Sequence, residues 1–183
     1  MVCYFDIETD GLHRGARITC AATWSDAGAL LWHSNFASYM KLSDLTRLID
    51  FLCQQSPLVT FNGANFDFRV LYYCTLDPRV LQLAKSHIDI CLCFGASKGY
   101  FGSLDSFMQG CNIPGKSGCG GNAIDLWLQG SREDKVGILN YCKNDVRCLK
   151  DLYVRMIRNK MNVYRQTKSG RRQKWIPKLD TVD

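Results

Sequence analysis

Carboxylate side chains occur inside segments that are otherwise apolar, and this limits the folds open to the chain. Val2–Ile7 is rich in β-branched and aromatic residues, which predicts a buried strand. Because strand side chains alternate between faces, Asp6 and Glu8 are expected on one side, roughly 6.6 Å apart. Two carboxylates so close are costly to half-bury unless a cation lies between them. The alternative is an ordinary edge strand with solvated acids.

A second acidic residue pattern follows the short apolar segment Leu58–Phe61, which is also predicted to be a strand. An Asn-Gly turn signal comes next, and Asn65 is the expected N-cap of a helix over Phe66–Leu76. This assignment places Asp67 in the first helical turn, where the helix dipole alone would favour a carboxylate. A strand end beside a helix start also lies at the rim of the sheet, where sites in α/β folds gather.

The third pattern lies within Glu133–Ile157, where apolar residues recur at helical spacing. Tyr141 and Asp145 are four residues apart and therefore share one face of the predicted helix. An aspartate among apolar neighbours on that face is unusual. It is either a half-buried carboxylate hydrogen-bonded to Tyr141 or part of a site that the other two patterns complete.

The three blocks in this order resemble a known family of enzymes. The blocks are Phe5–Gly11 (FDIETDG), Phe61–Asp67 (FNGANFD) and Tyr141–Asp145 (YCKND). They are similar to the motifs of the DEDD superfamily of 3′–5′ exonucleases, in its tyrosine-containing branch, and most similar to stand-alone exonucleases related to the proofreading domain of family B DNA polymerases. The resemblance covers residues 1–157, including Ser103–Gly115. It implies an α/β ribonuclease H-like fold, with a central mixed β-sheet flanked by helices.

The resemblance also implies a two-metal-ion mechanism. The expected metal ligands, which are also catalytic, are Asp6, Glu8, Asp67 and Asp145. All-carboxylate ligands suit two Mg²⁺ or Mn²⁺ ions rather than zinc. Such an ion pair stabilises the attacking and leaving oxygens of an in-line displacement. Tyr141 is expected to orient the attacking water, because a phenol with a pKa near 10 is a poor base at neutral pH.

Contacts to the 3′-terminal nucleotide are likewise implied by the resemblance. They fall after the first motif and within the second, at Thr9, Gly11, Leu12, Asn62 and Phe66. For Leu12 and Phe66, packing in the core is the alternative explanation.

Gly110–Ser117 (GCNIPGKS) matches the phosphate-loop pattern, but its surroundings do not fit that motif. A phosphate loop follows a strand and precedes a helix. Here Leu104–Met108 is predicted to be helical, and the glycine-rich residues after Ser117 are unsuited to starting a helix. We therefore expect a loop beside the active site, with Lys116 near substrate phosphate, rather than a nucleotide-triphosphate site.

The basic charge lies in the C-terminal extension, residues 158–183. Residues 1–157 have equal numbers of basic and acidic side chains, so the net charge of +6 comes from this extension. We expect nucleic-acid contacts from its cations and aromatic rings, notably Arg165, Arg171, Arg172 and Trp175. A turn at 168–171 predicts a small hairpin, and a chain truncated after Asn159 is expected to remain a folded, metal-dependent nuclease. A solvated basic tail of no specific role is the alternative.

Composition agrees with an intracellular enzyme of one domain plus this extension. The chain has 183 residues, is 46% hydrophobic and has ten cysteines, yet no C-x-x-C pair that would suggest zinc. Reduced thiols, the absence of a membrane-length apolar run and the absence of a signal-peptide pattern predict a cytoplasmic protein.

The sequence therefore predicts a metal-dependent 3′–5′ exonuclease that acts on single-stranded nucleic acid, with DNA favoured as substrate. An exoribonuclease is the first alternative, because the four carboxylates are indifferent to the sugar. A non-catalytic nucleic-acid-binding module on the same fold is the second. Four clustered acids argue against this second alternative, because they would repel a polyanion that is only to be bound.

Overall fold

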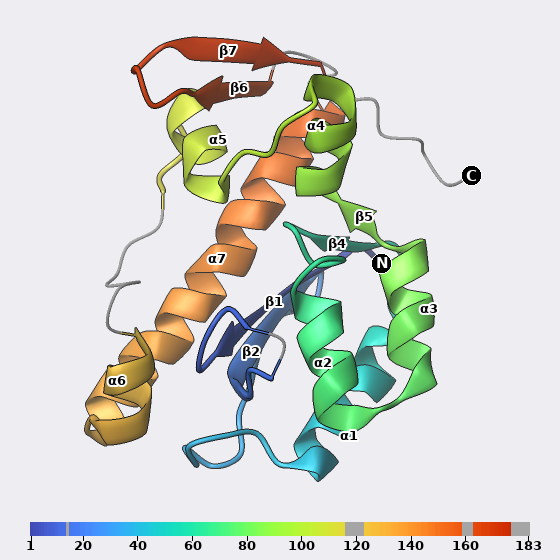
Figure 1. Cartoon of the computed structure of the whole chain (residues 1–183), viewed down its shortest axis with the longest axis vertical. Helices are drawn as coiled ribbons and strands as arrows, with labels where there is room; N and C mark the ends of the chain where they lie inside the picture. The colour runs from blue at the N-terminus through green and yellow to red at the C-terminus, as the bar shows by residue number, and fades with distance from the viewer. Residues whose placement is uncertain (14, 116–122, 159–162, 177–183) are drawn as a thin grey trace.

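A five-stranded mixed sheet forms the centre of the structure, a computed structural model that describes residues 1–13, 15–115, 123–158 and 163–176 (Figure 1). Its strand order is β3-β2-β1-β4-β5. The strands are β1 (Cys3–Thr9), β2 (Ile18–Ser25), β3 (Gly28–Trp32), β4 (Leu58–Thr60) and β5 (Ile88–Asp89). The first three are antiparallel, whereas β4 runs parallel to β1 and to β5. The predicted α/β fold with a central mixed sheet is confirmed.

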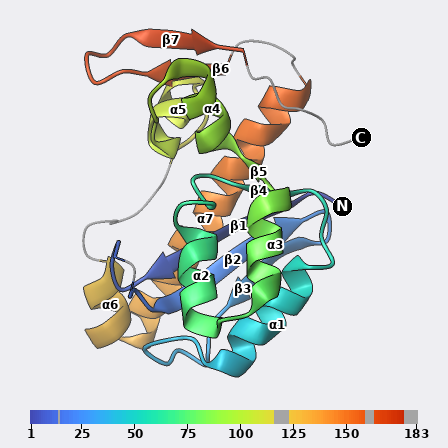
Figure 2. The same cartoon turned by 45° about the vertical axis from the view of Figure 1, so that its right-hand side comes forward.

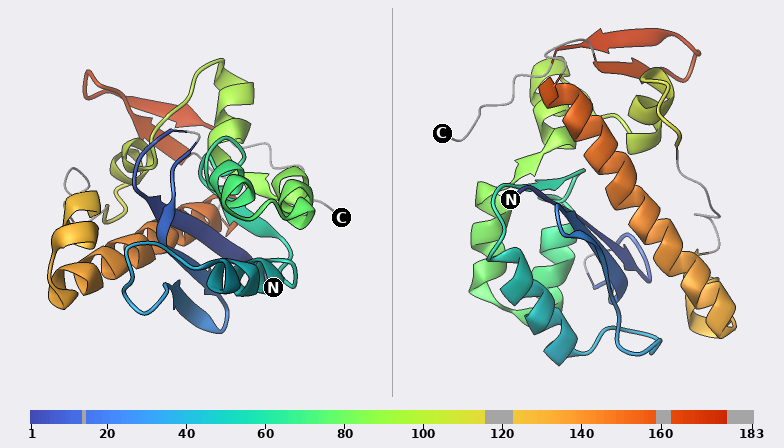
Figure 3. Two further views of the ribbon diagram at one scale, coloured as in Figure 1. Left: turned by 60° about the horizontal axis from the view of Figure 1, so that its bottom comes forward. Right: turned by 180° about the vertical axis from the view of Figure 1, so that it is seen from behind.

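Helices cover both faces of the sheet. One face carries α1 (Leu42–Leu52), α2 (Asp67–Thr75) and α3 (Pro78–Ser86), seen in front of the strands in Figure 2. The long helix α7 (Arg132–Arg158) crosses the other face diagonally, as Figure 3 shows from behind. The remaining helices are α4 (Ile90–Lys98), α5 (Leu104–Gly110) and α6 (Ala123–Gln129). No helix in the described ranges is both long enough and apolar enough to cross a membrane.

The alternation of side chains on β1 decides where its acids lie. Cys3, Phe5 and Ile7 are buried in the core beneath α1–α3, whereas Tyr4 belongs to the core on the α7 side. Asp6 and Glu8 have the parity of Tyr4, so they lie on the side of the sheet that α7 covers. The predicted placement of both acids on one face is therefore confirmed, and it directs them toward the helix of the third motif.

The second motif differs in one detail from its prediction. Helix α2 starts at Asp67 and its N-cap is Phe66, with no side-chain capping bond. The predicted cap at Asn65 is therefore wrong. Its side chain instead donates to Asn62 Oδ1 at 3.1 Å, within the turn that precedes the helix. Asn62 itself has φ +68°, a left-handed conformation that asparagine tolerates better than most residues.

The C-terminal extension is part of the core. Strands β6 (Val163–Gln166) and β7 (Arg172–Trp175) form the predicted hairpin, which lies above α4 and α5 in Figure 1. Trp175 is 1% exposed, and its ring centroid lies 5.2 Å from that of Phe94 and 5.8 Å from that of Phe107. A ring so buried has no surface for a base, so the prediction that Trp175 binds substrate is wrong. The same packing makes the hairpin a contributor to the core, so a chain truncated after Asn159 would leave Phe94 and Phe107 without this cover.

Backbone contacts also join the hairpin to α5. The Cys111 thiol lies 3.3 Å from both the N–H and the carbonyl oxygen of Tyr164, so one sulfur contacts both polar groups of that residue. Gly110 approaches the same strand so closely that a Cβ there would lie 2.3 Å from the Tyr164 carbonyl oxygen. The apparent phosphate loop therefore follows helix α5 rather than a strand, as predicted, and its glycine serves close packing.

Candidate active site

The first motif ends at an irregularity of the sheet. The register between β1 and β2 shifts between Glu8 and Thr9, and such bulges commonly re-aim side chains beside active sites. Two hydrogen bonds hold Glu8–Asp10 at this point. Thr19 Oγ1 donates to the Glu8 carbonyl oxygen at 3.0 Å, and the Arg17 N–H donates to Asp10 Oδ1 at 2.7 Å. The bulge and these bonds fix the loop that carries Gly11 and Leu12.

The second motif is held in place by a residue far away in sequence. The Asp89 carboxylate accepts hydrogen bonds from the backbone N–H groups of Asn62 at 2.8 Å and Ala64 at 3.1 Å. It also caps α4 by accepting from Leu92 N–H at 3.2 Å. Asp67, at the end of this turn, is 3% exposed and accepts from the Ile7 N–H at 3.1 Å. The turn and β1 are thereby joined at the site.

Burial dominates the electrostatics of the two aspartates. It raises the pKa of Asp67, and the hydrogen bonds from its own backbone N–H and that of Ile7 only partly offset this. Burial also acts on Asp89, but the His87 side chain and the N–H groups of the turn outweigh it and hold the pKa of Asp89 below its ordinary value. The donors around Asp89 therefore favour its anionic form, whereas burial makes protonation of a metal-free Asp67 easier than that of a solvated aspartate.

All five predicted catalytic residues line one cavity of about 370 Å³. The cavity lies between β1, the β4–α2 turn and α7. Its acidic and phenolic lining residues from the three motifs are Asp6, Glu8, Asp67, Tyr141 and Asp145. Asp10 adds a further carboxylate, and no lysine or arginine is among the described residues that line the cavity. A concave site with this charge favours a bound cation over a bound anion.

Metal-ligand geometry is present where β1 meets α7. One carboxylate oxygen each from Asp6 and Glu8 and the sulfur of Cys142 all lie within 4.8 Å of one another. The Cys142 thiol is buried and contacts the Asp6 carbonyl oxygen at 3.8 Å. Asp145, one helical turn further along α7, is 4% exposed. The oxygen donors of this set fit a hard divalent ion such as Mg²⁺ or Mn²⁺.

The predicted substrate contacts near the chemistry also surround the cavity. They are Thr9, Gly11, Leu12, Asn62 and Phe66. Leu12 is 90% exposed, which rules out core packing as the reason for its apolar side chain. Phe66 is partly buried against the core of α1–α3 and also faces the cavity. Lys116 lies outside the described residues.

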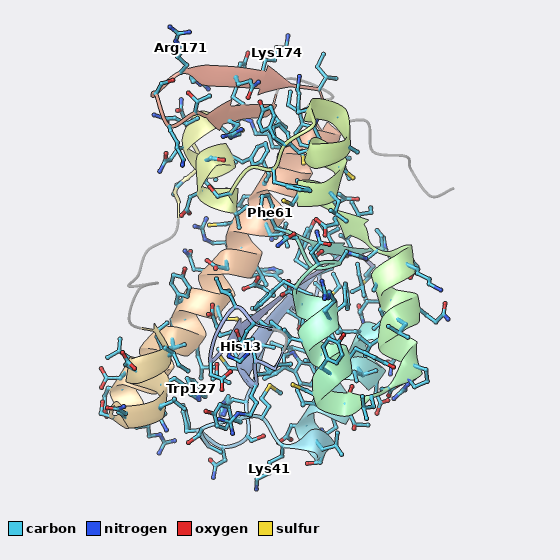
Figure 4. The ribbon with its side chains drawn as sticks, in the orientation of Figure 1. His13, Lys41, Phe61, Trp127, Arg171 and Lys174 are labelled. Carbon is cyan, nitrogen blue, oxygen red and sulfur yellow. The ribbon has the colours of Figure 1, made fainter. Side chains whose placement is uncertain are left out.

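The hairpin arginines do not line this cavity among the described residues. Arg172 donates twice to the Gly110 carbonyl oxygen, at 2.9 and 2.6 Å, and its guanidinium lies over the Tyr164 ring. Arg165 lies over Phe94 and Tyr100. Arg171 is exposed at the turn of the hairpin and points away from the body of the molecule in Figure 4. The Arg165 and Arg172 side chains therefore have evident structural contacts, whereas the described contacts of Arg171 are those of its backbone with Thr167.

Two residues of the site were not identified from the sequence. Asp89 directly precedes a helix, which is an N-cap signal, but its contact with Asn62 depends on the pairing of β4 with β5. Cys142 was considered only as one of the ten cysteines expected to be reduced thiols. Its position next to Tyr141 on α7 was the available signal, because a helix that brings Asp145 to the carboxylates brings its neighbouring turn as well.

Comparison with known proteins gives three findings. A family model described as RNase_H superfamily matches residues 3–157. No curated protein matches the chain. Among solved structures, the family B DNA polymerase from the hyperthermophilic archaeon Pyrobaculum calidifontis superposes with a TM-score of 0.65 over 85% of this chain at 14% sequence identity. The chain spans 24% of that polymerase, so the likeness concerns the fold of one part of it.

Proposed function

Because this chain belongs to the RNase H superfamily, we propose that it is a metal-dependent 3′–5′ exonuclease whose preferred substrate is single-stranded DNA. The observation that carries the proposal is the meeting of Asp6, Glu8, Asp67, Asp145 and Tyr141 in one cavity. These residues come from three segments that are far apart in the sequence. An exoribonuclease is the alternative, because no contact that would distinguish deoxyribose from ribose is evident among the described residues of the cavity.

The carboxylates would hold the metal ions. Asp6 and Glu8 already have oxygens close enough to share one ion, and Asp145 and Asp67 line the same cavity. A bound divalent ion would supply Lewis-acid stabilisation of charge on the phosphate oxygens and a more acidic water. Without a cation, the buried carboxylates repel one another and the incoming phosphate, so the metal-free cavity is unsuited to binding a polyanion.

The protein side chains would position the substrate and the attacking water. Tyr141 can donate a hydrogen bond into the cavity and so orient a water without removing its proton. The exposed Leu12 side chain offers an apolar surface to the terminal base, and Phe66 offers another beside the second motif. If these two side chains contact the terminal nucleotide, the linkage held at the carboxylates is the last one of the strand. The enzyme would then remove one nucleotide at a time.

A non-catalytic binding module is the rival proposal. Binding alone would favour basic side chains in the cavity, whereas its described lining includes five carboxylates and no cation. An acidic cavity is useful to a nucleic acid only when metal ions neutralise it. The charge of the site therefore favours catalysis.

The test uses oligonucleotides of one sequence, as DNA and as RNA, labelled at the 5′ end. With Mg²⁺ or Mn²⁺ we expect a ladder of labelled products that shorten by single nucleotides, and no products with chelator. A labelled mononucleotide as the first product would indicate degradation in the 5′–3′ direction. A few discrete internal fragments would indicate an endonuclease. The Asp6→Ala variant controls for contaminating nucleases, and no cleavage by the unmodified protein would refute the proposal.

A further inference from the structure

A second cavity continues from the acidic one toward the loop between α4 and α5. It has a volume of about 590 Å³ and shares Asp6, Leu12, Phe61 and Asn62 with the first. Figure 4 labels Phe61 at this boundary, between the part formed by α4, α5 and the hairpin and the part that contains α2. A chain leaving the carboxylates in this direction would meet the α4–α5 loop next.

Phe101 is the exposed aromatic residue of that loop. It lines the second cavity and is 61% exposed. Its ring lies against Gly95 on α4, so closely that a Cβ at position 95 would be 2.5 Å from a ring carbon. One side of the ring is thus supported by a residue with no side chain, and much of the rest is open to solvent. Single exposed apolar residues are common, but this one lies in a cavity joined to the candidate active site.

Positive charge lies behind the same loop. The Arg165 side chain of the hairpin passes Gly102, which also lines the second cavity. Its buried Nε would be 3.4 Å from a Cβ at that glycine and has no hydrogen-bond partner among the described residues, so it is the charge of the guanidinium as a whole that lies near the cavity. An aromatic surface with a nearby cation is the combination that binds a single strand, because every base has a π-face and every linkage a phosphate.

We propose that Phe101 is a second base-binding position, on which a base upstream of the 3′-terminal nucleotide stacks. The ligand is a single strand, because a base in a duplex is already stacked on its neighbours and cannot take up a ring. This inference rests on the proposed function for the direction in which the strand lies. It extends that function by naming the feature that selects single-stranded ends.

Binding and cleavage are measured separately. Binding is followed in Mg²⁺ by fluorescence anisotropy with a labelled 12-nucleotide DNA strand whose 3′-terminal linkages are phosphorothioates, which resist cleavage. The variants are Phe101→Ala and Gly95→Ala; the latter introduces a helix-favouring residue into α4 but displaces the ring. The control is Leu81→Ala, an equally simple truncation of an exposed apolar residue on α3. Strands with 2-aminopurine at the second, third or fourth position from the 3′ end report where stacking occurs.

We expect both ring variants to bind the single strand about 5- to 150-fold more weakly, the range for one stacked base. The 2-aminopurine signal should change at one position only, and Leu81→Ala should bind as the unmodified protein does. Unchanged affinity in Phe101→Ala, or an equal loss on a blunt duplex, would overturn the inference. Absence of cleavage with metal in the unmodified protein would instead refute the proposed function, whatever the binding data show.

Discussion

The Asp89 carboxylate, at the end of β5, accepts a hydrogen bond of 2.8 Å from the backbone N–H of Asn62, 27 residues earlier in the chain. Its second oxygen accepts from Ala64 N–H at 3.1 Å. These two bonds hold the turn that presents Asn62, Phe66 and Asp67 to the cavity. The geometry of the second motif thus depends on a buried anion that is not among the proposed metal ligands.

Asp89→Ala should therefore lower the rate of cleavage as well as stability. Asp77→Ala is the matched control, because Asp77 also caps a helix, accepting from Arg79 N–H at 2.9 Å, but on α3. Loss of a cap costs about 0.5–2 kcal/mol in either variant. We expect a larger fall in denaturation midpoint for Asp89→Ala, which leaves three backbone N–H groups without their acceptor, and a fall in kcat for Asp89→Ala alone. Equal kcat in both variants would show that Asp89 serves the fold only.

Asp6→Ala should abolish metal-dependent cleavage without weakening the fold. The substitution removes an oxygen that lies within 4.8 Å of the Glu8 carboxylate, and with it a repulsion in the metal-free protein. Thermal denaturation in chelator should show an unchanged or higher midpoint. Asp26→Ala, an exposed acid in the turn between β2 and β3, should keep full activity. Appreciable Mg²⁺-dependent cleavage by Asp6→Ala would contradict the assignment.

Asp67 should make the metal-free protein more stable as pH falls. Burial raises its pKa in the folded state to about 7, above the unfolded value near 3.9. The folded state therefore binds this proton more tightly. The stabilising contribution is complete below about pH 3.9 and is lost as pH rises toward 7, on the order of a few kcal/mol.

The measurement for Asp67 is the denaturation midpoint in chelator between pH 4.5 and 8. Asp67→Asn should raise the midpoint at pH 8 and flatten its dependence on pH. Asp26→Asn, which replaces an exposed carboxylate in the turn between β2 and β3, provides the control. A slope that persists unchanged in Asp67→Asn would assign the effect to other groups.

Tyr141→Phe should reduce turnover far more than substrate binding. If the hydroxyl orients the attacking water, its removal costs on the order of 10–10³ in kcat. The apparent Kd for a cleavage-resistant phosphorothioate strand in Mg²⁺ should stay within about twofold of the value for the unmodified protein. Tyr39→Phe removes a hydroxyl that accepts from Arg17 at 2.6 Å, outside the described lining of the cavity, and serves as control. An unchanged kcat would show that the Tyr141 ring only packs.

The hairpin should contribute charge to binding through its exposed side chains. Arg171 and Lys174 point outward in Figure 4, so replacing both with glutamine should leave the fold intact. The slope of log affinity against log salt should decrease by roughly 0.7 for each phosphate that these cations neutralise in the unmodified protein. Identical slopes in the two proteins would show that these cations do not contact substrate phosphates.

Trp175→Ala should lower the free energy of unfolding by about 3–5 kcal/mol, because it empties a core position.

Local patterns in the sequence identified most of the site. The alternation in Val2–Ile7 and the i, i+4 spacing of Tyr141 and Asp145 each fix a face within one element, so they predicted which side chains would meet. Helix α7, the hairpin and the mixed sheet followed from periodicity, turn signals and motif order. Asn65 was misassigned as an N-cap because an asparagine side chain can form a hydrogen bond either to a helix N-terminus or within a local turn. Here it donates to Asn62 within the turn.

Non-local contacts account for what was missed. Asp89 meets Asn62 only because β4 and β5 pair, and Phe101 has a supported ring only because Gly95 lies beneath it on α4. Trp175 was misassigned for the same reason. Among basic neighbours it suggested a base-stacking surface, but the side chains of a strand alternate, and its side of the hairpin faces Phe94 and Phe107.

The burial of Trp175 has a consequence for the order in which the molecule can be completed during synthesis. While only residues up to 158 have left a ribosome, Phe94 and Phe107 have no indole against them, and Cys111 has no strand to contact. The carboxylates and Tyr141 would already be present, but α4 and α5 would lack their cover. The core around these two helices can therefore close only after the hairpin has emerged, later than the sheet that carries the first two motifs.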